Sequence, residues 1–83
     1  NNALKQYHAQ ILTKAIDALK EQTPKERMSA TDVLPIDSKY LKEVDRLSRQ
    51  FSAEVIKLSE KSKVKDAVYA LSVHFFRLNQ ERK

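Results

Sequence analysis

Apolar residues recur at helical spacing along the first quarter of the chain. From Leu4 they follow the i, i+3, i+4 rule as far as Leu19, which predicts a helix over residues 3–21. The sequence Gln22-Thr23-Pro24 should end this helix, because proline disfavours helical backbone at the residue before it.

Residues 22–37 have little apolar periodicity and contain more turn-forming residues. Thr23 and Glu26 have the spacing of a capping box, with proline at the first helical position between them. We therefore expect one short turn over residues 24–29, followed by an irregular connection. A second helix then starts with Asp37 or Ser38 as its N-cap.

Two further helices are expected in the rest of the chain. The second helix, over residues 38–60, has apolar positions that step by four, three, four, four and three residues: Tyr40, Val44, Leu47, Phe51, Val55 and Leu58. The third, over residues 63–81, has steps of four, three, four and three: Val64, Val68, Leu71, Phe75 and Leu78. The polar link between them is short, so they should lie antiparallel. No stretch alternates convincingly with period two. The prediction is an all-α, three-helix antiparallel bundle with a short extra turn between helices 1 and 2.

The predicted third helix carries a second apolar stripe. Tyr69, Val73 and Phe76 lie about 140° from the first stripe on a helical wheel. A helix that is apolar on two separate faces is usually buried on both, and two neighbouring helices can cover only one of them. The second stripe therefore predicts a partner-binding surface, with Lys65 and Arg77 supplying charge at its rim.

Other interpretations of this stripe stay open at this point. The three residues could fill a wide core, or pack under the connection between the first and second helices. A fourth helix outside the sequence could also cover them.

Composition narrows the class of protein. The chain has 83 residues, a net charge of +5, no glycine and no cysteine. The length predicts one domain, residues 1–83. The Asn-Asn start suggests that it is excised from a larger protein, with a processed mature chain as the alternative. Absence of glycine and cysteine excludes glycine-rich phosphate loops, disulfides and thiolate chemistry. No stretch has the length of a membrane span or the pattern of a signal peptide, so no membrane partner is expected.

Catalytic and metal-binding chemistry finds no support in the pattern. His8 and His74 have no Asp, Glu or Cys at ligand spacing beside them, and each lies near an apolar stripe. No serine has a His and Asp at a recognisable spacing. We therefore expect no catalytic residues, no metal site and no cofactor. The chain is predicted not to be an enzyme.

Basic residues lie along one side of the second helix. Lys42, Arg46 and Arg49 form a strip that has the chemistry to bind phosphate groups, so a nucleic-acid-binding module is one alternative. Glu43 and Asp45 dilute its positive field. A second alternative is a structural helical bundle that self-associates, in which the partner is another copy of the chain.

The sequence also resembles two families of transcriptional interaction module. The run from Tyr40 to Ser48 is similar to the second helix of SRI domains, and Tyr7 to Leu19 is similar to their first. The aromatic-rich stretch from Tyr69 to Phe76, ending in charged residues, resembles the third helix of KIX domains. The resemblance implies a nuclear, intracellular protein that binds an acidic activation peptide or a phosphorylated polymerase tail. Together, these observations predict a non-enzymatic protein-protein interaction module in transcription that binds a peptide or partner helix.

Overall fold

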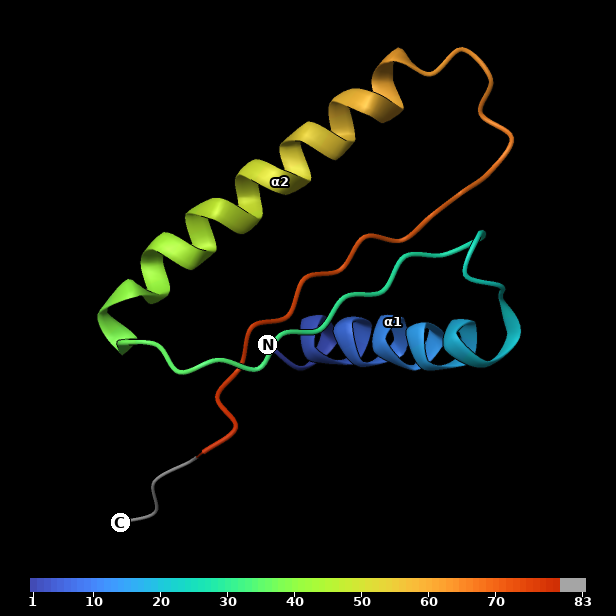
Figure 1. The fold of residues 1–83 in the computed structure, drawn as a ribbon. Coiled ribbons are helices and arrows are strands. Elements are labelled where there is room, and N and C mark those ends of the chain that lie inside the picture. Colours follow the sequence, from blue (N-terminus) through green and yellow to red (C-terminus); the bar gives the residue numbers. More distant parts are fainter. Residues whose placement is uncertain (80–83) are drawn as a thin grey trace. The chain divides into compact units, whose positions relative to one another are not determined.

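The computed structural model describes residues 1–79, and these contain helices and no strands. The elements are α1 (Asn2–Glu21), the 3-10 helix η1 (Ser38–Tyr40) and α2 (Leu41–Lys61), as Figure 1 shows. The chain divides into two compact units, Asn1–Lys42 and Glu43–Lys83. The all-α class predicted from the sequence is confirmed.

The first unit contains α1 within one residue of the predicted range. The side chain of Asn1 caps it, accepting a hydrogen bond from the backbone N–H of Leu4 at 3.1 Å. The helix stops at Gln22, whose backbone is extended with φ −97° and ψ 146°. This break lies two residues before Pro24, where the sequence predicts it.

A short turn follows the break. The backbone N–H of Thr23 donates to Oε1 of Glu26 at 2.8 Å, and the backbone N–H of Glu26 donates back to the carbonyl of Thr23 at 2.9 Å. The first of these contacts is the one that the capping-box spacing predicts for the Glu26 side chain, and the second is a backbone turn. The turn covers residues 24–26 and no helix continues from it; residues 27–37 have no regular secondary structure.

The second helix lies where the sequence places it. Asp37 accepts a hydrogen bond from the backbone N–H of Lys39 at 2.9 Å and caps η1, which leads directly into α2. Polar groups close the other end of α2. The Ser62 hydroxyl donates to the carbonyl of Leu58 at 2.7 Å, and the Lys65 ammonium donates to that of Ser59 at 2.6 Å. Both carbonyls belong to the last turn, which has no helical partners of its own.

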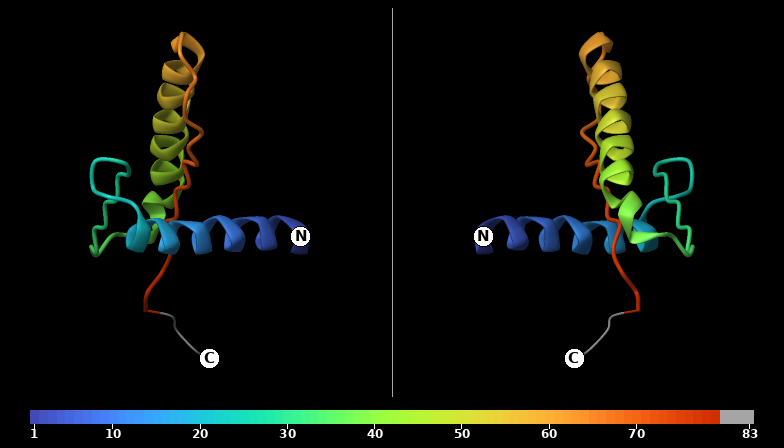
Figure 2. Two further views of the ribbon diagram at one scale, coloured as in Figure 1. Left: turned by 90° about the vertical axis from the view of Figure 1, so that its right-hand side faces the viewer. Right: turned by 90° about the vertical axis from the view of Figure 1, so that its left-hand side faces the viewer.

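The predicted third helix is wrong over residues 63–79. These residues form no helix or strand; their trace turns back after α2 and runs in the opposite direction to it (Figures 1 and 2). The remaining predicted positions, 80 and 81, lie outside the described residues. The three-helix antiparallel bundle is therefore wrong, and the described part of the chain has two α-helices.

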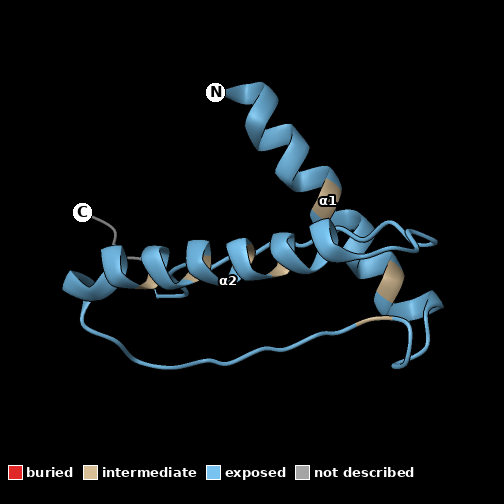
Figure 3. Ribbon diagram, turned by 90° about the horizontal axis from the view of Figure 1, so that it is seen from above, coloured by how far each residue is buried: buried red, intermediate tan, exposed pale blue. Residues whose placement is uncertain are grey.

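None of the described residues is buried (Figure 3). Side chains with intermediate exposure are few, and the α2 members among them share one side of the helix. They are Ile11, Ala18, Arg27, Val44, Ser48, Ser52 and Val55. The described residues therefore have amphipathic helices without a closed hydrophobic core.

Candidate interaction surface

The first part of the candidate surface is a stripe of apolar side chains on α2. It spans about 80° of the helical wheel and consists of Val44, Leu47, Phe51, Val55 and Leu58. We call it the α2 stripe. Val44 and Val55, on one edge of the stripe, are half-buried, whereas Leu47 and Leu58, on the other edge, are exposed. The stripe is thus covered along one edge only.

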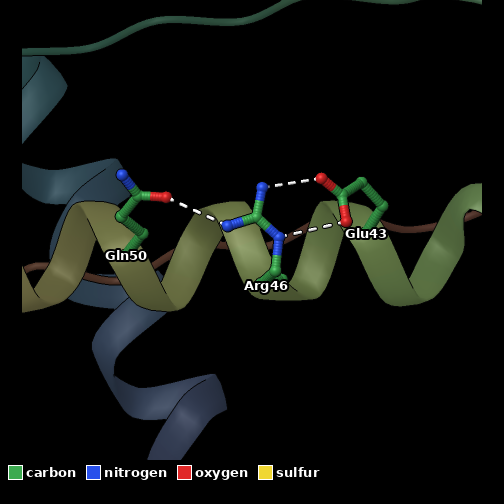
Figure 4. Close-up of polar contacts among 3 residues, drawn as sticks. All are labelled: Glu43, Arg46 and Gln50. Carbon is green, nitrogen blue, oxygen red and sulfur yellow. Dashed lines mark hydrogen bonds and ion pairs between the residues drawn. The ribbon is translucent and has the colours of Figure 1, made fainter.

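The opposite face of α2 is held by ion pairs between neighbouring turns. Arg46 contacts both carboxylate oxygens of Glu43, with Nη2 at 2.6 Å and Nε at 3.0 Å, and its Nη1 donates to Gln50 at 3.2 Å (Figure 4). Hydrogen bonding to Arg46 lowers the pKa of Glu43 and raises the pKa of the guanidinium. These contacts are i, i+3 and i, i+4 pairs that support an exposed helix.

The same contacts bear on the predicted phosphate-binding residues. Arg46 is engaged by Glu43, and Arg49 donates to Asp45 at 2.8 Å, which raises the pKa of Arg49. The Lys42 side chain forms no ion pair with any of the described residues. Two of the three cations are therefore neutralised locally by carboxylates, which weakens the field that a phosphate would meet. A phosphate-binding role for these residues stays a prediction.

The second part of the candidate surface is the extended stretch Val68–Phe76, which we call the 68–76 segment. Its large apolar side chains are unequally exposed. Leu71, Val73 and Phe75 are 44%, 50% and 46% exposed, whereas Tyr69 and Phe76 are 71% and 73% exposed. Positions 71, 73 and 75 recur every second residue, which is the periodicity of an extended backbone rather than of a helix.

This arrangement changes how the predicted partner-binding residues group. The helical stripe that joined Tyr69, Val73 and Phe76 is absent, because residues 63–79 are not helical. Tyr69 and Phe76 remain strongly exposed, while Val73 shares the lower exposure of its neighbours two residues away. Lys65 follows the end of α2 by four residues, and its ammonium donates to the carbonyl of Ser59 in the last turn of the helix. Arg77 directly follows the segment, and a partner-binding role for all five residues stays a prediction.

The 68–76 segment also has a period-two pattern, which the prediction of a helix did not take into account. Apolar side chains occupy four alternate positions and small or polar ones occupy the three between them. The apolar set is Tyr69, Leu71, Val73 and Phe75, and the intervening set is Ala70, Ser72 and His74. Such alternation is typical of a half-covered extended strand. It could have found Leu71 and Phe75 as companions of Val73.

Neither histidine belongs to a metal-binding cluster among the described residues. The ring of His8 lies against that of Tyr7, with centroids 6.0 Å apart, and a ring nitrogen of His74 is 2.5 Å from the Ser72 hydroxyl oxygen. Within residues 1–79, no group of three or more His, Cys, Asp or Glu side chains is placed to hold a metal ion. None of the helices described there has the length and apolarity to cross a membrane.

These features define an all-α protein with two amphipathic helices and an exposed apolar extended segment. The chain belongs to the family described as "Domain of unknown function (DUF4423)", which matches residues 1–78. No curated protein and no solved structure matches the chain. The match includes both helices and all of the 68–76 segment, so both parts of the candidate surface lie within the family domain.

Proposed function

We propose that this domain acts by binding another protein, which covers the apolar surface that the chain leaves exposed. The observation that carries the proposal is the absence of a buried residue in the described chain, despite regular amphipathic helices. Burial of apolar surface is the main term that offsets the conformational entropy lost on folding. A partner that supplies this burial would stabilise the domain as well as bind it.

Two surfaces favour a protein partner over nucleic acid. The exposed edge of the α2 stripe and the aromatic side chains of Tyr69 and Phe76 are apolar, and aromatic anchors are typical of protein interfaces. In contrast, Arg46 and Arg49 on the basic strip are already paired with carboxylates. A role in transcription, and a nuclear location, stay predictions based on the resemblance to KIX and SRI modules.

Site-specific photocrosslinking of the full-length protein in cells tests the proposal. The photoreactive analogue p-benzoylphenylalanine replaces Phe76 in one variant and the neighbouring, more covered Phe75 in a matched control. A third variant carries it at Lys25, in the polar turn after α1, as a background control. We expect a defined protein adduct from position 76, a weaker one from position 75 and none from position 25.

The adduct is identified by mass spectrometry, and either another protein or a second copy of this chain is consistent with the proposal. Equal labelling at all three positions would contradict it, because the surface would then make only random contacts. Adducts to nucleic acid alone would favour the alternative function, in which binding weakens steeply as the salt concentration rises.

A further inference from the structure

We draw no further inference here: the strongest candidate, the exposed apolar patch of Leu12, Ile16 and Leu19 on α1, is an unpartnered helix face, and nothing in the structure shows what covers it.

Discussion

The helix α2 and the segment after it share one apolar pattern and differ in structure. Both have apolar residues at steps of three and four, but α2 is helical over Leu41–Lys61 and residues 63–79 form no helix. The difference follows from the residues between the apolar positions. In α2 the intervening residues include charged side chains that pair across one turn, such as Arg46 with Glu43 and Lys57 with Glu54.

The segment lacks that local support. Asp66 is the one carboxylate among residues 63–79, and β-branched or aromatic residues occupy many of the positions that hold Lys, Arg or Glu in α2. These side chains lose rotamer freedom in a helix and pack well on an extended backbone. The comparison shows that apolar spacing selects a helix only where the intervening residues also favour it.

Matched serine-to-proline substitutions should give the largest contrast between the two regions. Ser52→Pro removes a backbone donor in the middle of α2 and should destabilise the helix by about 3 kcal/mol or more. Ser72→Pro lies in a segment with no helical hydrogen bonds to lose, so the far-ultraviolet circular dichroism should be unchanged. An equal loss of helical signal at 222 nm in both variants would contradict the difference between the regions.

The two adjacent phenylalanines should separate association from internal packing. Phe76→Ala removes the more exposed ring and should weaken association by about tenfold or more, with a smaller change in the melting temperature. Phe75→Ala removes the less exposed ring. It should lower the melting temperature more than it weakens association. Sedimentation and thermal melts of both variants provide the measurements. A fall in stability alone for Phe76→Ala would place that ring inside the fold.

The basic strip of α2 (Lys42, Arg46 and Arg49) should support the stability of the helix but should not contribute to partner binding. Substitution of Arg46 and Arg49 by alanine breaks their pairs with Glu43 and Asp45, so we expect a small loss of helicity. The yield of the photocrosslink at Phe76 should be unchanged. Loss of that adduct together with loss of binding to duplex DNA would favour the nucleic-acid alternative.

Acidification should have the smallest effect of these changes on the stability of the chain. It should act on the local contact between Thr23 and Glu26. The hydrogen bond from the backbone of Thr23 lowers the pKa of Glu26 below its ordinary value of 4.5. The stabilisation is therefore complete above the unfolded pKa and is lost as the pH falls through the lower folded value. NMR titration of the Thr23 amide and the Glu26 carboxyl should show one shared transition. Glu26→Gln should remove it, and a transition above the ordinary value would contradict the contact.

The sequence predicted the features that depend on neighbouring residues. The two helices, the break before Pro24, the contacts between Thr23 and Glu26 and the cap at Asp37 all form within a few positions along the chain. The predicted third helix failed because residues 69–75 satisfy both a helical and a period-two pattern. Apolar spacing alone could not decide between them.

The candidate surface was predictable in part. Tyr69 and Phe76 belong to the second apolar stripe of the sequence, and both are exposed aromatic residues in the structure. Their grouping with Val73 depended on the predicted helix and is wrong, because residues 63–79 form no helix. The apolar pattern of α2 likewise does not specify which edge of the α2 stripe is half-buried.

Backbone chemical shifts of the full chain in solution test the central claim most directly, namely that the apolar segment after α2 is an extended surface and not a helix. The account predicts Cα shifts displaced toward helical values over residues 41–61 and toward extended values over residues 68–76. Helical displacement across residues 63–79 would contradict it. That result would remove the exposed segment that the proposed partner is expected to cover.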